Sequence, residues 1–309
     1  MTARFGLRRL VIGGLLAIIV VVVAACGSIG RAGAADGKVH VITTTTIFAD
    51  MVRQVGGDRV SVESLVPKGG EVHTFDPTPG DIRRITEAEI AFRNGLGLDD
   101  WLASLIEDAG TSAPLVALGT DLPGVTLIAG EEGSGEAVNP HLWMNVAYGS
   151  LYAERIAAEL TKVDPEGATA YKDGLAAYQA RLADLDAYAR DQLGAIPEAN
   201  RNVVSFHDAF PYFAAAYGLT IDGTIVDAPG QDPSAGAIAA LVQAIRDHGV
   251  KAIFSEAQFN PDLAQTIANE TGATIVSTLY TDTVGDAPQD TYESMMRWNV
   301  DQVVAALEG

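Results

Sequence analysis

Residues 69–79 read Gly-Gly-Glu-Val-His-Thr-Phe-Asp-Pro-Thr-Pro, and this stretch joins a predicted strand to a predicted helix. The preceding residues 60–66 are rich in valine and alternate between apolar and polar side chains, as a strand does. Glycine and proline on both sides of His73 indicate a shaped loop. Thr78 followed by Pro79 favours a helix start, because threonine caps helices and proline suits the first helical position. The loop therefore places one imidazole where a strand gives way to a helix.

Outward from this loop, strands and helices alternate along the chain. The apolar patterns predict strands at residues 39–44, 60–66, 89–94, 115–118, 125–128, 202–206, 220–225, 250–255 and 273–279. They predict helices at 47–55, from 79, and at 101–109, 146–160, 208–217, 233–248, 260–272 and 289–307. Such alternation is typical of α/β folds with mainly parallel sheets flanked by helices.

The longest predicted helix, residues 164–194, separates the two halves of this pattern. Apolar residues recur along it at steps of four and three, and about 29 residues would span roughly 43 Å. A coiled coil is the alternative, but strong aliphatic a and d positions are missing. We therefore expect one rigid bridging helix between an N-terminal α/β lobe (residues 38–163) and a C-terminal α/β lobe (residues 195–309).

The first 26 residues have the features of an export signal. Three arginines precede an apolar run over residues 10–25, which ends in small residues before Cys26. The run is short for a membrane-spanning helix, which needs about 20 residues. Val-Ala-Ala-Cys at positions 23–26 resembles a bacterial lipobox, which implies lipidation of Cys26; an ordinary secretory signal is the alternative. Residues 27–37, mostly glycine, alanine and serine, are expected to form a flexible tether.

Composition excludes several classes of protein. Cys26 is the only cysteine, so the chain can form no intrachain disulfide and no thiolate metal cluster. The formal net charge is −20, and it becomes −23 without the first 26 residues, which carry three arginines and no acid. This surface argues against nucleic-acid binding and favours cations nearby, although solubility alone would also explain it. An apolar content of 48% excludes a disordered chain.

Five side chains with metal-binding chemistry fall at or soon after predicted strand ends. In parallel sheets, ligands bind outside the carboxyl ends of the strands. Two of the five belong to the N-terminal lobe and three to the C-terminal lobe, which predicts a metal site in the cleft between lobes. They are His73, His141, His207, Glu256 and Asp282.

A structural role is the alternative for each of these side chains. Asp282 also suits an ordinary turn. Glu256 ends an apolar strand. We expect it to contact a metal-binding histidine and orient that ring, rather than to bind metal itself. His40, inside a strand, and His248, at a helix C-terminus, look structural.

Four motifs occur in order, at residues 70–77 (around His73), 139–143 (Asn-Pro-His-Leu-Trp), 205–210 (around His207) and 280–285 (around Asp282). Together they resemble the zinc/manganese class of solute-binding lipoproteins that feed ABC importers, and the resemblance extends over the mature chain. It implies two α/β lobes bridged by one long helix. It also implies His73, His141, His207 and Asp282 as metal ligands.

The resemblance further implies that the protein captures a divalent transition metal and delivers it to an ABC permease. It would do so as a monomer, anchored by lipid to the outer face of the bacterial cell membrane. Three imidazoles and one carboxylate suit zinc. Manganese is the alternative: it favours more oxygen ligands, and residues 130–138 are acidic and lack the histidines that many zinc-specific relatives carry there.

A surface zinc metalloenzyme with hydrolytic activity is the alternative function, because three histidines and a water also make catalytic zinc. A catalytic site keeps an open coordination position, however, whereas Asp282 would close it. The chain also lacks a His-Glu-x-x-His helix and a Gly-x-Ser-x-Gly elbow. A binding protein, not an enzyme, is therefore expected.

Overall fold

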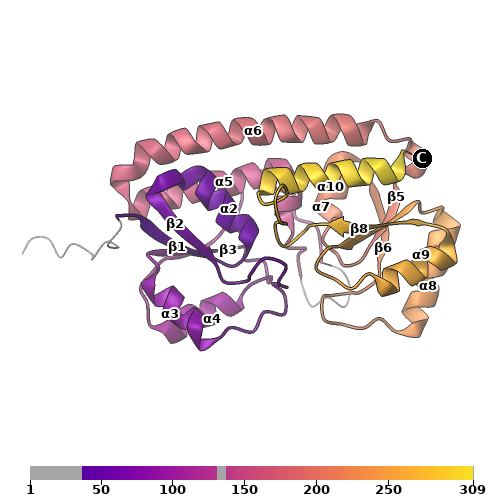
Figure 1. Ribbon diagram of the computed structural model, residues 1–309, viewed down its shortest axis with the longest axis horizontal. Coiled ribbons are helices and arrows are strands. Elements are labelled where there is room, and N and C mark those ends of the chain that lie inside the picture. The colour runs from indigo at the N-terminus through magenta and orange to yellow at the C-terminus, as the bar shows by residue number, and fades with distance from the viewer. Residues whose placement is uncertain (1–36, 131–136, 309) are drawn as a thin grey trace, which may run out of the picture. The chain divides into compact units, whose positions relative to one another are not determined.

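The computed structural model describes residues 37–130 and 137–308 (Figure 1). Val39–Gly309 forms one compact unit that contains two four-stranded parallel sheets. The predicted signal segment, Cys26, nearly all of the tether and the acidic residues Glu131, Glu132 and Glu136 lie outside the described residues. Among the described helices, none combines the length and the apolar character that crossing a membrane requires.

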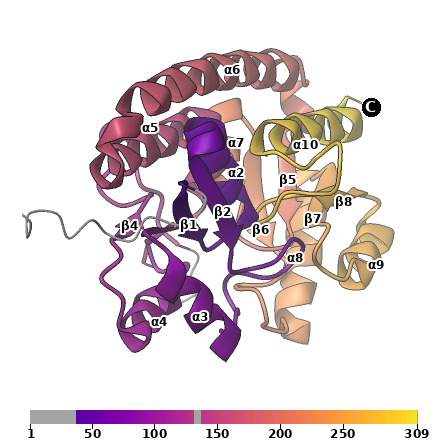
Figure 2. The ribbon, with the colours of Figure 1, turned by 60° about the vertical axis from the view of Figure 1, so that its left-hand side comes forward.

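The first sheet has the strand order β2-β1-β3-β4, with every neighbouring pair parallel. Helices cover both faces: α3 and α4 pack on one side through apolar residues such as Ile85 and Leu102, and α2 lies on the other (Figure 2). The elements are β1 Val39–Thr43, α2 Thr46–Gly56, β2 Val60–Ser64, α3 Pro79–Glu87, β3 Ile90–Arg93, α4 Trp101–Ala109 and β4 Leu115–Ala117.

The second sheet repeats this arrangement with the order β6-β5-β7-β8, again all parallel. Helices α8 and α9 pack on one face around Val204 and Ile253, while α7 and α10 contribute to the core on the other face. The elements are β5 Asn202–Ser205, α7 Pro211–Tyr217, β6 Thr220–Thr224, α8 Ala235–His248, β7 Ala252–Glu256, α9 Asp262–Thr271, β8 Thr274–Leu279 and α10 Tyr292–Leu307. We call each sheet with its helices a lobe.

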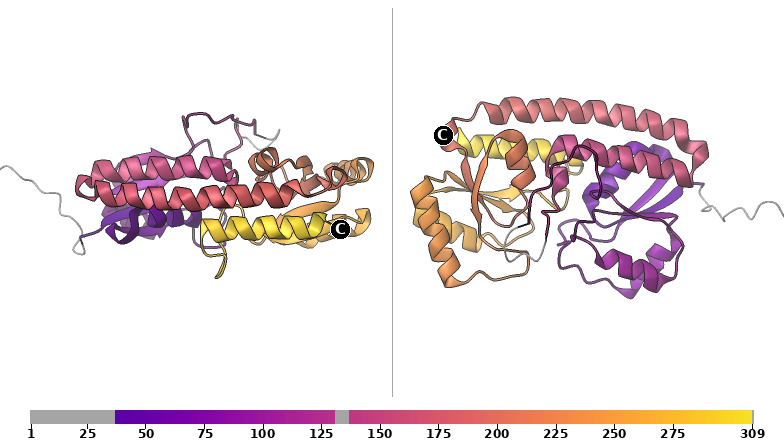
Figure 3. Two further views of the ribbon diagram at one scale, coloured as in Figure 1. Left: turned by 90° about the horizontal axis from the view of Figure 1, so that it is seen from above. Right: turned by 180° about the vertical axis from the view of Figure 1, so that it is seen from behind.

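The chain passes between the lobes through α5 (Val146–Val163) and the 27-residue α6 (Ala168–Gly194). Helix α6 runs beside α5 and α10 (Figure 3) and also contacts α2, so it packs against helices of both lobes. Its buried face includes Tyr171, Tyr178 and Leu185. Helices of the same chain cover this face, as expected for a bridging helix rather than a coiled coil. The predicted α/β fold with two parallel sheets and one long helix is confirmed.

The strand predicted at residues 125–128 is wrong. These residues form no strand; only Ala129 makes an isolated antiparallel bridge, with Val138. The backbone N–H groups that a strand would pair are used otherwise. Thr126 N donates to the Tyr148 hydroxyl at 3.3 Å, and Ile128 N donates to the Tyr212 hydroxyl at 3.0 Å.

Gly174 sets how closely α6 approaches the first lobe, and we expect Gly174→Ala to destabilise the protein. A helix interior normally prefers alanine to glycine by about 1 kcal/mol. Here an added Cβ would lie 2.3 Å from the Val55 carbonyl oxygen, and overpacking of this kind costs about 1–3 kcal/mol. Gly194→Ala, in the same helix, is the matched control, because its Cβ would meet nothing within 4 Å. Equal free energies of unfolding for the two variants in urea would contradict this close packing.

Candidate metal centre

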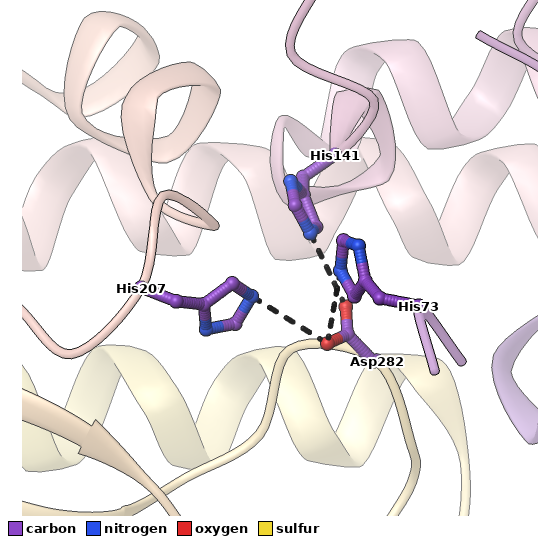
Figure 4. Close-up of side chains that lie close together, drawn as sticks. All are labelled: His73, His141, His207 and Asp282. Atoms are coloured by element: carbon purple, nitrogen blue, oxygen red, sulfur yellow. Dashed lines mark ion pairs between the residues drawn. The ribbon is translucent and has the colours of Figure 1, made fainter. Parts of the chain in front are cut away.

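The four residues implied as ligands come together from two lobes. His73 lies in the loop between β2 and α3, His141 immediately precedes the short helix Leu142–Met144, and His207 and Asp282 follow β5 and β8. Their side chains point toward one another (Figure 4). One potential ligand atom from each lies within 4.8 Å of all the others. Parallel topology explains the approach of His207 and Asp282, because the carboxyl ends of all strands of a sheet share one edge. His141 lies in the long connection after β4, so no strand end places it.

The separations within the cluster exceed hydrogen-bond lengths but match those of donors around a cation. Nε2 of His141 lies 3.5 Å from Oδ1 of Asp282, while Nε2 of His207 and of His73 lie 3.6 and 3.9 Å from Oδ2. The three rings are 5.3–5.7 Å apart, centroid to centroid. Tetrahedral ligands at 2.0–2.2 Å from zinc stand about 3.3–3.6 Å from one another. The spacing therefore suits a small ion at the centre.

Burial makes the arrangement costly without a cation. The side chains of Asp282, His207 and His141 are 0%, 1% and 2% exposed, and that of His73 is 11% exposed. Within the described residues, neither carboxylate oxygen of Asp282 accepts a hydrogen bond, and Nε2 of His141 and of His207 has no such partner. A buried charge is expensive unless it is paired or coordinates a metal. The donor chemistry thus fits a divalent metal ion.

Glu256 contacts His207, as expected of a residue that orients a ligand. Its Oε1 lies 2.8 Å from Nδ1 of His207, and both side chains are buried. Burial acts to lower the pKa of His207, but the negative charges of Glu256 and Asp282 outweigh it and raise this pKa to about 9. Glu256 thus holds the ring with Nε2 facing the cluster.

His141 has the opposite electrostatics. Burial, together with the nearby His207 and His73, holds its pKa well below 6.5, so the ring is neutral at physiological pH. Burial also raises the pKa of Asp282 to about 6, against the lowering effect of His207 and His73.

Two residues of the motif at 139–143, Asn139 and Trp143, make contacts that the sequence did not predict. Asn139 Oδ1 accepts a hydrogen bond from the backbone N–H of His141 at 3.0 Å. The indole N–H of Trp143 donates to the Thr281 carbonyl, next to Asp282, at 2.7 Å. Their place in the motif pointed to these residues but not to their partners. His40 and His248 lie outside the cluster; His248 Nδ1 instead lies 2.9 Å from Oδ1 of Asp222.

Residues 41–306 match the protein family described as Zinc-uptake complex component A periplasmic. The chain belongs to this family. It is 30% identical to the manganese-binding lipoprotein MntA of Halalkalibacterium halodurans, over 97% of this chain and 99% of that protein. It is also 30% identical to the iron ABC transporter substrate-binding lipoprotein MtsA of Streptococcus pyogenes, over 96% and 97%. Among solved structures, the periplasmic zinc binding protein TroA from Treponema pallidum superposes with a TM-score of 0.80 at 28% identity, covering 88% of this chain and all of that one.

Membership of this family confirms the main interpretation of the sequence. The protein is a substrate-binding component of a metal ABC importer, and the metalloenzyme alternative finds no support.

Proton release should accompany metal binding at this centre. With its pKa raised to about 9, His207 carries a proton at pH 7.5, and a metal can bind its Nε2 only after that proton leaves. We expect release of about one proton per zinc ion, measured by calorimetry in buffers of different ionisation enthalpy. Glu256→Gln removes the charge that raises this pKa, so it should reduce the release. A binding enthalpy independent of buffer would contradict this electrostatic picture.

Proposed function

We propose that His73, His141, His207 and Asp282 bind the transported metal directly, and that this metal is zinc, with manganese as the alternative. The observation that supports the proposal is the convergence of four donor atoms from two lobes within 4.8 Å. The buried carboxylate of Asp282, without hydrogen bonds from the described residues, supports it further.

Ligands from two lobes couple binding to the separation of the lobes. Capture draws the strand ends of residues 38–163 and 195–309 together, and release to the permease requires a hinge or shear movement that separates them. Residues 164–194 link the two lobes in this scheme. The transported ion is itself the cargo, so the protein needs no chemistry beyond binding and release.

The types of donor atom favour zinc, whereas the geometry of the Asp282 carboxylate is also compatible with manganese. Sites with nitrogen and oxygen donors bind zinc more tightly than manganese in general. The two oxygens of Asp282 face different histidines, Oδ1 toward His141 and Oδ2 toward His207. A carboxylate binding through both oxygens would raise the coordination number, as manganese prefers. The relatives carry manganese, iron and zinc in their names. A competition experiment between zinc and manganese would therefore decide which metal this site prefers.

Metal binding should stabilise the folded protein in a pH-dependent way. At 100-fold excess over Kd, a ligand adds about 2.7 kcal/mol to the free energy of unfolding. We expect a zinc-induced rise in melting temperature at pH 7.5 that fades toward pH 5, because protons compete for the imidazoles and Asp282, with a pKa of about 6, loses its charge. Manganese should give a smaller rise at equal concentration.

The matched variants for these melting curves are His207→Ala, which should abolish most of the rise, and His248→Ala, outside the cluster, which should keep it. A zinc effect that is equal at both pH values, or that survives His207→Ala, would rule out this site. A larger effect from manganese than from zinc would reverse the assignment of the metal.

We further propose that the protein works as a monomer, held by lipid on Cys26 to the outer face of the bacterial cell membrane. The relatives named above from Halalkalibacterium and Streptococcus are called lipoproteins. The sequence Val-Ala-Ala-Cys at 23–26, after an apolar run, supports the same attachment here. One lipid chain alone anchors weakly, so stable attachment takes more than one.

Cys26→Ala should therefore release the protein from the membrane or block its processing, because no thiol remains to carry lipid. Fractionation of cells into membrane and soluble parts, with the size of the chain read by immunoblot, provides the measurement. A correctly processed Cys26→Ala protein that stays in the membrane fraction would exclude lipidation as the attachment.

A further inference from the structure

Asn139 is a buried side chain that touches the ligand segments of both lobes. It lies two residues before His141 and is fully buried. Its backbone is held on both sides, since its N–H donates to the Ile128 carbonyl at 2.9 Å and its carbonyl accepts from the Tyr212 hydroxyl at 3.0 Å. The amide therefore extends from a fixed point.

The oxygen of this amide faces His141. Oδ1 accepts a hydrogen bond from the His141 backbone N–H at 3.0 Å and lies 3.2 Å from Nδ1 of its ring. An amide oxygen can only accept, so Nδ1 must carry the ring proton. In a neutral imidazole this leaves the lone pair on Nε2, the atom 3.5 Å from Oδ1 of Asp282.

The nitrogen of the same amide faces the other lobe. Nδ2 donates to the Asp208 backbone carbonyl at 2.6 Å and to its Oδ2 at 2.8 Å. Asp208 directly follows His207. Rotating the amide by 180° would set NH2 against the His141 N–H and oxygen against two acceptors, so the hydrogen-bond partners allow only one orientation. One amide thus joins the segments of two proposed ligands across the lobes.

We infer that Asn139 is a positioning residue that fixes His141 with Nε2 toward the metal and latches its segment to that of His207, slowing metal release. The inference rests on the proposed function. Glu256 differs in kind, because it orients His207 from within the same sheet. Asn139 instead spans two lobes, so its hydrogen bonds to Asp208 must break when the lobes separate.

The test compares Asn139→Ala and Asn139→Asp with the wild type in three measurements. These are zinc affinity by chelator competition, the zinc dissociation rate, and the ¹⁵N chemical shifts of the His141 ring in metal-free protein at pH 7.5. Loss of such a supporting partner typically weakens metal binding 10–100-fold. We expect Asn139→Ala to show that loss, faster dissociation, and ring signals that no longer report a proton fixed on Nδ1.

Asn139→Asp separates the two roles. It keeps an acceptor for His141 but sets a second carboxylate against the acceptors of Asp208, so dissociation should accelerate while the Nδ1 signal of the ring still reports a bound proton. Added negative charge alone would instead slow dissociation. Asn145→Ala is the matched control in the same segment. It loses the cap that accepts from Ala147 N at 3.0 Å, and it should lower stability without changing zinc affinity or release.

Wild-type dissociation from Asn139→Ala, or His141 ring signals unchanged in it, would overturn the inference. If Asn139→Ala does not fold, Asp208→Ala tests the latch, because it removes one of the two acceptors; unchanged dissociation would then overturn it. Failure of the wild type to bind zinc or manganese would sink the proposed function instead. The ring signals of the metal-free protein distinguish that result from a failure of the positioning role.

Discussion

One buried carboxylate lies where the two lobes meet and limits what the site can hold. Asp282 belongs to the C-terminal lobe, is fully buried, and receives no hydrogen bond from the described residues, yet residues of the other lobe hold its neighbours. Trp143 donates to the Thr281 carbonyl at 2.7 Å, and Thr283 accepts from Gly69 N at 3.0 Å. Contacts to Thr281 and Thr283, the two neighbours of Asp282 in the chain, hold this side chain in place. Its own carboxylate oxygens remain directed at the three histidines.

Sequence periodicity predicted the parallel sheets, and the second sheet explains why His207 and Asp282 meet beyond its strand ends. His141 lies in the connection after β4 and owes its place to no strand end. Prediction from sequence failed where side chains, instead of a neighbouring strand, accept hydrogen bonds from the backbone. The segment at residues 125–128 has a strand-like pattern, but tyrosine hydroxyls take its N–H groups. The role of Asn139 could not be predicted from the sequence either, because its amide donates to a residue 69 positions away. Local propensity carries no information on such a contact.

The helical layer limits how the lobes can separate. Arg181 on α6 donates to Gln54 of the first lobe at 2.6 Å and to Glu293 of the second at 3.0 Å. Asp50 on α2 accepts from Tyr292 N, at the start of α10, at 2.9 Å. These contacts fasten both lobes to one rigid helix, so we expect movement to concentrate in the loops at the strand ends. The hydrogen bonds between lobes in those loops are then the contacts that must break if the lobes separate.

The two ring partners also explain why the site suits a divalent ion. Nδ1 of His207 faces a carboxylate, whose charge raises the pKa of that ring. Nδ1 of His141 faces a neutral amide, and burial with the neighbouring His207 and His73 holds its pKa low. Besides Asp282 and Glu256, the charge of Glu71 also acts on His207 and Asp282, so the cluster is strongly acidic once His207 loses its proton. A cation offsets this buried negative charge, and a divalent ion does so better than a monovalent one. The imidazole donors then favour transition metals among the divalent ions.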